Sequence, residues 1–319
     1  MILLISENYD KSMFRISEWL KFYKAKHLII FEDSHVKIKE VSFSEGEVEM
    51  EIDVDGEKIL YSDITSYYWR RADGFFEWSE KLNIQMESNN AFYVDEYITL
   101  QNFFYFLLSR KKGIGRRLQS IRLNKLTALY IAKKVGFLVP PSMIIENKQQ
   151  LQSFFLKSCK VFLKPMSDLR LFEKNGKTYT FDNKPYLNDS FLEGNEEFYN
   201  SLIQTYIEKK YELRVFVFKT KIYAMAIFSQ RNKKTMYDFR DYSVLVPYTP
   251  YKLSTVVENQ ILHFMKEMDI DTGSIDFIVD NQGDLYFLEI NPVGIFDMVS
   301  SPCKYHIEKD IAYFLTQEQ

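Results

Sequence analysis

The chain has 319 residues, of which 46% are apolar and 16% aromatic, so it can bury a large core spread over two or three lobes. It has 41 lysines and arginines against 44 acidic residues, a balance that indicates neither a nucleic acid partner nor an anionic membrane partner. Its two cysteines, Cys159 and Cys303, lie far apart without metal-ligand spacing, which argues against a disulfide framework and a zinc site. No apolar run approaches the roughly 20 residues that span a bilayer, and we therefore expect a soluble protein of the reducing cytoplasm.

The first segment, residues 1–115, has the pattern of a small α/β lobe. A buried strand at residues 2–5 is followed by an amphipathic helix and by a second strand at residues 27–31. Residues 41–62 alternate between polar and apolar side chains and turn at Asp55-Gly56, which predicts a β-hairpin.

The basic stretch RKKGIGRRLQSIRLNK, residues 110–125, leads into the second segment, residues 116–200. This stretch runs into a predicted helix that ends at Gly136, and the strand KVFLKP follows at residues 160–165. The third segment, residues 201–319, has strands at residues 213–218 and 222–228, then a helix, a last hairpin and a terminal helix. A capping box of Thr255 and Glu258 predicts where the first of these helices starts.

The last hairpin carries two carboxylates and an amide. The runs SIDFIV and DLYFLEI flank a four-residue turn. If Val279 pairs with Asp284, the period of two places Asp276, Glu289 and Asn291 on one face, with the two carboxylates as diagonal neighbours. Hard oxygen ligands at a diagonal of about 7–8 Å suit Mg²⁺ bound to phosphate. A solvated sheet face is the alternative, and a slip of one residue would destroy the arrangement.

This hairpin, with FLEINPVG at its end, resembles the metal-binding hairpin of the ATP-grasp ligases, in which an Asp, a Glu and an Asn hold two Mg²⁺ ions on the ATP phosphates. The piece QTYIEKKYELRVFV resembles the adenine hinge of the same enzymes, where backbone groups meet the purine and Glu212 would hold the ribose. The resemblance implies ATP and Mg²⁺ as cofactors. The residues it implies for nucleotide binding are Lys125, Lys164, Gln204, Thr205, Tyr206, Ile207 and Glu212.

Four longer stretches resemble the ATP-grasp peptide maturases of the graspetides, of the grasp-with-SPASM type: YYWRRADG, IGRRLQSIRLNKL, QRNKKTMYDFRDY and NPVGIFDMVSSPCKYHIEKDIAYFL. This resemblance implies an α/β ATP-grasp fold with an N-terminal lobe (1–115), a central lobe (116–200) and a C-terminal lobe with the metal site (201–319). It places Arg214, Asp238 and Arg240 beside the reacting groups and implies a homodimer. The region PMSDLRLFEKNGK departs from the pattern, since it has only Gly176 where many ATP-grasp enzymes have a glycine-richer loop.

The function implied is a peptide maturase. It would activate Asp or Glu side chains of a ribosomal precursor peptide as acyl phosphates and condense them with Ser or Thr hydroxyls, or with Lys amines. A leader segment of the precursor would be held outside the catalytic cleft, and the acidic loop from Asp189 to Glu197 is a candidate contact for it. One alternative is a carboxylate-amine ligase that adds an amino acid to a small molecule or protein tail. Another is a nucleotide-binding scaffold without turnover.

Two further features have competing interpretations. Arg70 and Arg71 follow the strand that begins at Ser66, and they are either functional residues or a solvated pair. Aromatic residues from Phe92 to Phe106 recur at helical intervals, which favours a core or a subunit interface over a base-stacking platform.

Overall fold

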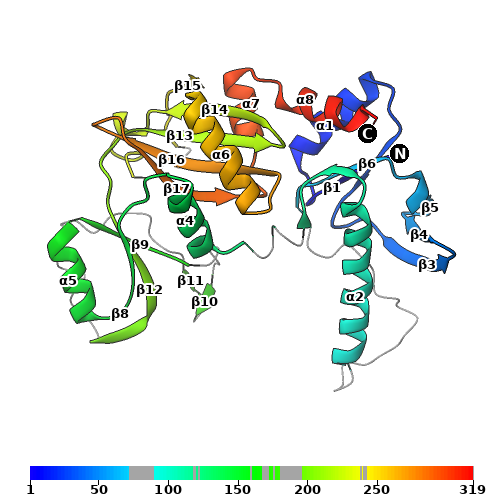
Figure 1. Cartoon of the computed structure of the whole chain (residues 1–319), viewed down its shortest axis with the longest axis horizontal. Helices are drawn as coiled ribbons and strands as arrows, with labels where there is room; N and C mark the ends of the chain where they lie inside the picture. The colour runs from blue at the N-terminus through cyan, green and yellow to red at the C-terminus, as the bar shows by residue number, and fades with distance from the viewer. Residues whose placement is uncertain are drawn as a thin grey trace. The chain divides into compact units, whose positions relative to one another are not determined.

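The computed structural model describes residues 1–71, 90–117, 120, 123–158, 160–166, 172–174, 177–179, 196–237, 239 and 243–318. The chain divides into two compact units (Figure 1). The first unit comprises Met1–Arg122, Ile270–Thr272 and Ile295–Gln319, and the second comprises Leu123–Asp269 and Gly273–Gly294. The predicted α/β class is confirmed, whereas the lobe boundaries at residues 115 and 200 stay a prediction.

A parallel sheet forms the centre of the first unit, with strand order β2-β1-β6-β7. Strands β1 and β6 are buried along their whole length, as is usual for parallel strands covered by helices. The expected lobe of strand, helix and strand is therefore confirmed. The elements are β1 (Ile2–Ile5), α1 (Lys11–Phe22), β2 (His27–Ile30), β6 (Ser66–Trp69), β7 (Lys112–Ile114), α7 (Asp297–Cys303) and α8 (Ile307–Thr316), and α8 packs against α1.

An antiparallel sheet of β3 (Val36–Ser44), β4 (Glu47–Val54) and β5 (Glu57–Leu60) also belongs to the first unit. Asp55 and Gly56 both have positive φ, 52° and 89°, which is the type I′ geometry that a tight hairpin requires. The predicted turn is thus confirmed. The short helix η1 (Tyr61–Asp63) and the long helix α2 (Asn90–Ser109) complete this part, and the Tyr61 hydroxyl donates to the Leu107 carbonyl at 3.1 Å.

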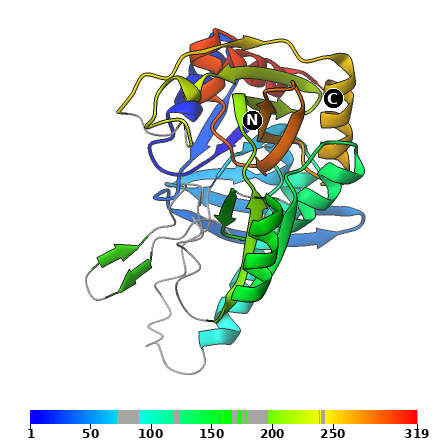
Figure 2. The ribbon, with the colours of Figure 1, turned by 90° about the vertical axis from the view of Figure 1, so that its left-hand side faces the viewer.

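The second unit is built on a five-stranded sheet of order β15-β14-β13-β16-β17. Its strands are β13 (Lys209–Phe218), β14 (Lys221–Ile227), β15 (Tyr248–Tyr251), β16 (Thr272–Asp280) and β17 (Leu285–Asn291). Helices α4 (Lys125–Lys134) and α6 (Thr255–Glu267) lie side by side on one face of the sheet, and Figure 2 shows them, green and gold, on the same side. Ring contacts such as Phe264 on Phe287, with centroids 5.0 Å apart, fill the layer beneath them.

Both helix starts are set by capping side chains. Asn124 Oδ1 accepts from the backbone N–H groups of the first turn of α4, and that helix ends before Gly136 as predicted. Helix α6 begins one residue earlier than its predicted box, because Ser254 is the N-cap and its Oγ accepts from Val257 N at 3.3 Å. The capping role predicted for Thr255 was therefore wrong by one position.

A smaller antiparallel sheet, of order β8-β12-β9, completes the second unit. It contains β8 (Ser142–Asn147), β9 (Val161–Lys164) and β12 (Glu197–Thr205), with α5 (Lys148–Ser158) packed on it. Its core consists of Ile145, Leu151, Val161 and Ile203. A separate hairpin joins β10 (Phe172–Lys174) to β11 (Lys177–Tyr179).

The hairpin of β16 and β17 differs in register from the prediction. Val279 pairs with Leu285 rather than with Asp284. This slip of one residue, if it continued along the hairpin, would turn Glu289 to the face opposite Asp276. The predicted pairing was therefore wrong at the turn end of the hairpin.

A β-bulge corrects the slip before it reaches the carboxylates. The register shifts immediately after Asp276, so Leu288 of β17 has no opposite residue and Asp276 pairs directly with Glu289. Ser274 then pairs with Asn291. The shared face of the three polar side chains is thus confirmed, but Asp276 and Glu289 are direct partners and not diagonal neighbours.

Candidate functional site

Asp276 lies at the centre of a group of charged side chains in the second unit. Arg214, on the neighbouring strand β13, donates from Nη1 to both carboxylate oxygens of Asp276 at 2.8 and 2.7 Å. Burial nevertheless raises the pKa of Asp276 to about 6, because Arg214 offsets only part of that effect and the carboxylates of Glu289 and Glu212 add to it. A cation beside Asp276 would therefore be stabilised by this site.

Lys125 joins the group from the first turn of α4. Its Nζ lies 4.0 Å from Glu289 Oε2, and the two side chains are 23% and 41% exposed. The predicted phosphate lysine and the predicted metal carboxylate are therefore neighbours, although 164 positions separate them in the sequence.

Asn291 is fixed by the loop that follows it. Its Oδ1 accepts from Val293 N at 3.0 Å, and its main-chain oxygen accepts from Gly294 N at 3.0 Å. An amide oxygen has two lone pairs, so Oδ1 retains one for a cation. The loop closes tightly, since a Cβ on Gly294 would lie 2.4 Å from Ser274 Oγ.

Replacing Gly294 by alanine is expected to destabilise the protein by about 1–3 kcal/mol, because the added methyl overpacks Ser274 and the Asn291 carbonyl. The melting temperature, measured by calorimetry, would report this loss. Adding Ser274→Gly removes the atoms that clash and should recover part of the stability. A single variant that melts with the wild type would contradict the close packing.

The chemistry of this group can be compared with what Mg²⁺ needs. Among the described residues, no three His, Cys, Asp or Glu side chains are placed to hold a metal ion by themselves. Mg²⁺ in nucleotide sites is typically bound by one or two carboxylates together with phosphate oxygens and water. Asp276 and Glu289, with Oδ1 of Asn291, fit such a shared site and do not fit a closed protein cage.

The predicted adenine hinge follows β12, and part of its backbone is already engaged. Thr205 N donates to the Pro141 carbonyl and Tyr206 N to the Lys160 carbonyl, both at 2.9 Å. The Gln204 side chain is buried and donates from Nε2 to Ser142 Oγ at 2.9 Å. These three residues therefore have structural contacts, and Ile207 is the first hinge residue beyond them.

Aromatic side chains surround the hinge. The Tyr206 ring lies 5.6 Å from Phe162 and 6.1 Å from Tyr237, measured between centroids. Burial raises the pKa of Tyr206 to about 12, and Tyr237, Glu208 and Glu212 contribute to the same shift. The hinge and Glu212 therefore lie within electrostatic reach of each other.

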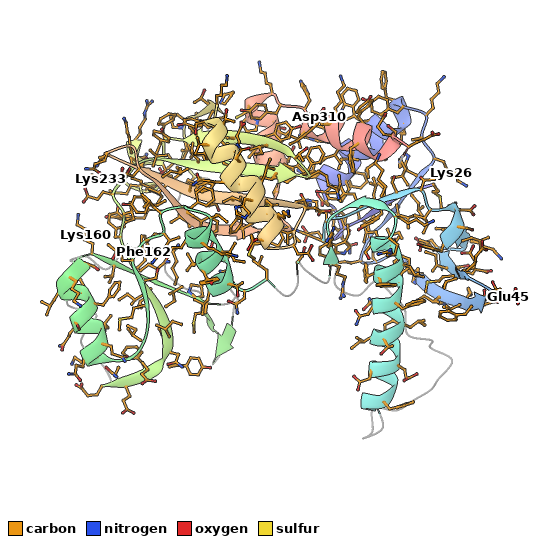
Figure 3. The ribbon with its side chains drawn as sticks, viewed as in Figure 1. Lys26, Glu45, Lys160, Phe162, Lys233 and Asp310 are labelled. Atoms are coloured by element: carbon orange, nitrogen blue, oxygen red, sulfur yellow. The ribbon has the colours of Figure 1, made fainter. Side chains whose placement is uncertain are left out.

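One ion pair at the hinge was not predicted. Lys160 lies just before β9, and Figure 3 shows it, with Phe162, beside α5. Its Nζ lies 2.5 Å from Glu208 Oε1. The acidic residue at position 208 was visible as an extra charge, but its partner lies 48 residues away, beyond any local pattern.

The two carboxylate oxygens of Glu212 differ in their hydrogen bonds. Oε1 accepts from Lys209 Nζ at 2.6 Å and from Ser229 Oγ at 2.5 Å, and all three residues are buried. In the part of the chain that the structure describes, no donor reaches Oε2.

Lys164, the second predicted phosphate lysine, ends β9 and pairs with Leu202 of β12.

Some predicted features lie outside the described residues. These are Asp238 and Arg240, the phosphate-covering loop around Gly176, and residues 189–195 of the acidic loop. Among the described residues, Arg214, Lys125 and Glu212 thus lie within contact or electrostatic range of the pair formed by Asp276 and Glu289. The roles of Asp238 and Arg240 stay predictions.

No protein family model and no curated protein sequence matches this chain. A solved structure that does match is a RiPP-associated ATP-grasp ligase from Chryseobacterium gregarium in complex with ADP and a leader and core peptide. It has a TM-score of 0.81 and 24% identity over 98% of this chain and 96% of that chain. The chain has the ATP-grasp fold.

Two further solved structures extend the comparison. The macrocyclase MdnC from Microcystis aeruginosa MRC, bound with precursor peptide MdnA, has a TM-score of 0.77 at 22% identity and covers 98% of both chains. D-alanyl-alanine synthetase A from Vibrio cholerae has a TM-score of 0.54 at 11% identity, over 99% of this chain and 97% of that chain. The predicted ATP-grasp fold is confirmed. No helix among the described residues is long and apolar enough to cross a membrane.

Proposed function

We propose that this ATP-grasp chain is a ligase that matures a ribosomal precursor peptide. It activates Asp or Glu side chains of the peptide as acyl phosphates and condenses them with Ser or Thr hydroxyls to esters, or with Lys amines to amides. The observation that carries the proposal is the pair of Asp276 and Glu289, with Arg214 and Lys125 in contact, on a fold shared with peptide-bound ligases.

The nucleotide would be ATP with Mg²⁺, and we place two ions at Asp276, Glu289 and Asn291. Lys125 and Lys164 would contact the phosphates. The purine would meet the backbone from Ile207 onward, since the N–H groups of Thr205 and Tyr206 are engaged. A ribose hydroxyl would donate to the open Oε2 of Glu212.

Each step of the reaction then has a protein group to stabilise it. A carboxylate oxygen of the peptide attacks the γ-phosphorus, ADP leaves, and the lysines and Arg214 offset the charge on the transferring phosphoryl group. Bound Mg²⁺ would withdraw further charge from the phosphate oxygens. A hydroxyl or amine of the same peptide then attacks the acyl carbon, phosphate leaves, and a proton is released. Arg240 and Asp238 are proposed at the substrate carboxylate.

The partner would be one peptide with two parts, a leader and a core. The Chryseobacterium ligase was solved with both parts, and MdnC with its precursor peptide. A leader held on the enzyme raises the effective concentration of the core at the site. We place the reaction in the cytoplasm, where ATP is available and where a free thiol such as Cys303 stays reduced.

We also propose a homodimer formed through α2. On this helix Phe92 is 65% and Phe106 51% exposed, and Phe43 of the adjacent sheet is 72% exposed. The Phe103 ring is tilted against that of Phe43 and stacked on that of Phe106, with centroids 5.7 and 6.2 Å apart, so these three rings form a continuous apolar surface. A surface of this kind on a soluble protein marks an interaction site.

Phe106→Glu is expected to shift the protein from dimer to monomer, since an interface core disfavours a buried charge. Light scattering after size-exclusion chromatography would measure the mass of the particle. Phe22→Glu places the same charge on α1 at a residue 71% exposed, and it should leave the mass unchanged. A Phe106→Glu protein that stays dimeric would reject this interface.

The proposed function is tested by incubating the protein with ATP, Mg²⁺ and the precursor peptide encoded beside its gene. Crosslinking removes one water per link, so the intact mass of the peptide should fall in steps while ADP is released. A carboxylate-amine ligase would instead raise the mass of its acceptor by an amino acid residue. An unchanged mass without ADP would reject the ligase and favour a scaffold.

A further inference from the structure

Lys209, the first residue of β13, is a buried cation that contacts two parts of the second unit. Its side chain is 4% exposed, and its Nζ lies 2.6 Å from Glu212 Oε1 and 3.3 Å from the carbonyl oxygen of Tyr237. Lysine is almost never buried to this degree unless it is paired. The ammonium group therefore ties a carboxylate of β13 to the main chain at Tyr237.

A second hydrogen bond joins the carboxylate of Glu212 to the start of residues 229–237, the segment that ends at Tyr237. This segment begins with the short helix η3 (Ser229–Arg231), and Ser229 Oγ donates to Glu212 Oε1 at 2.5 Å. Thr235 Oγ1 donates to the Ser229 carbonyl at 2.8 Å, and both residues are buried. Residues 229–237 are thus connected to Glu212 Oε1 at both ends, directly through Ser229 and through Lys209 at Tyr237.

The other carboxylate oxygen of Glu212, Oε2, is the one that can accept a hydrogen bond from a nucleotide. Because Oε1 is committed to Lys209 and Ser229, a hydroxyl donor from a nucleotide would bind Oε2, which reaches no donor among the described residues. A donor on Oε2 restricts the rotation of the carboxylate, and that restriction passes through Oε1 to the two groups bound there.

We propose that Lys209 is a positioning residue that couples a nucleotide at Glu212 to residues 229–237. This inference rests on the proposed function, in which Glu212 holds the ribose. The segment leads directly into Asp238 and Arg240, so fixing its main chain at Tyr237 would align the predicted substrate contacts once the nucleotide is bound. Lys209 thereby acts through Glu212 and the main chain and touches neither substrate.

A purely structural role is the competing explanation, because Lys209 also neutralises a buried carboxylate. The two explanations differ in how residues 229–237 respond to nucleotide. Hydrogen exchange followed by mass spectrometry, with and without ADP and Mg²⁺, measures this response directly and requires no turnover.

In the wild type, ADP with Mg²⁺ is expected to slow exchange both in the hinge after β12 and in residues 229–237, by about tenfold in the segment. In Lys209→Met the hinge should still respond at saturating ADP, whereas the response of residues 229–237 should largely disappear. Lys210→Met removes the same charge from an exposed neighbour and should behave like the wild type.

Ser229→Ala keeps the proposal testable if Lys209→Met does not fold. It removes one link without leaving an unpaired charge, and it should reduce the response of the segment while the hinge still responds. Equal responses of residues 229–237 in the wild type and in the foldable variants would overturn the coupling. If ADP does not bind the wild type, the proposed function fails, and the coupling that depends on it fails with it.

Discussion

Asp276→Asn should lower precursor-dependent ADP release by about 10²–10³-fold while the protein remains folded. The substitution keeps the size of the side chain and removes the charge that a cation at the site needs. Asp276 pairs directly with Glu289, so Glu289→Gln should have an effect of similar size. Coupled assay of ADP at saturating peptide would measure both variants.

The matched control for this experiment is Asp284→Asn. Asp284 is an exposed carboxylate at the turn end of the same hairpin, and its removal changes the net charge by the same amount. The control should retain nearly full activity. If Asp276→Asn and Asp284→Asn lose activity equally, or neither does, the carboxylate pair is not the metal site.

The pH dependence of Mg²⁺ binding provides a second measurement on the same residue. The pKa of Asp276 is raised to about 6, so a cation must displace a proton below that pH, and its affinity should fall about tenfold per pH unit there and level off above. Calorimetric titration with Mg²⁺ and ADP would show this, and Asp276→Asn should lack it. A wild-type affinity that does not change between about pH 5 and about pH 7 would contradict the assignment.

The stability of the metal-free protein should change in the opposite sense over the same range. The folded pKa of Asp276 lies above its ordinary value of 3.8, so the folded state binds this proton more tightly than the unfolded state does. The contribution to stability is therefore complete below about pH 4 and is lost as the pH rises through about 6. Bound Mg²⁺ should reverse this loss.

Asp10→Ala is expected to destabilise the protein by about 3–5 kcal/mol, since it leaves a buried arginine without its partner. Asp10 and Arg70 form an ion pair whose side chains are only 4% and 3% exposed. Burial lowers the pKa of Arg70 to about 10, so the guanidinium is still charged at neutral pH. Asp10 also accepts from Ser6 Oγ at 2.5 Å and, as the N-cap of α1, from Ser12 N at 2.9 Å.

Urea denaturation would measure this loss of stability. Glu7→Ala is the control: Glu7 pairs with Arg71, its side chain is 41% exposed, and its removal should cost less than about 1 kcal/mol. Adding Arg70→Met to Asp10→Ala should recover much of the loss, because the unpaired charge is then gone. Equal costs for Asp10→Ala and Glu7→Ala would show that burial of the pair contributes little.

Features encoded by neighbouring residues were predictable. The alternating hairpin with Asp55-Gly56 at its turn and the helix that ends before Gly136 each follow from a few consecutive side chains. The two-residue period of a strand also predicted that Asp276 and Glu289 share a face, although it did not predict how the residues of β16 and β17 pair. The bulge at Leu288 could not be foreseen, because the apolar pattern of this strand accommodates either register.

Pairings between distant segments were not predictable. Arg70 was predicted to be either a functional residue or part of a solvated pair, and the second alternative was wrong, because Arg70 is buried and pairs with Asp10, 60 residues away. The link from Lys209 to Tyr237 involves a main-chain oxygen, which carries no signature in the sequence. Such contacts depend on how strands and loops approach one another, and only the structure provides that information.

The first unit is built from both ends of the chain, and this affects the order in which the protein folds during synthesis. Ser66 Oγ, on a central strand of the parallel sheet, donates to the carbonyl of Leu315 at 2.8 Å, and Lys112 Nζ donates to that of Gln317 at 2.7 Å. Helix α8 packs on α1, yet nearly 300 residues are translated between them. The N-terminal part of this unit, Met1–Arg122, therefore has one side of its core uncovered until the last helix has been made, and in this interval it is most exposed to aggregation and to chaperones.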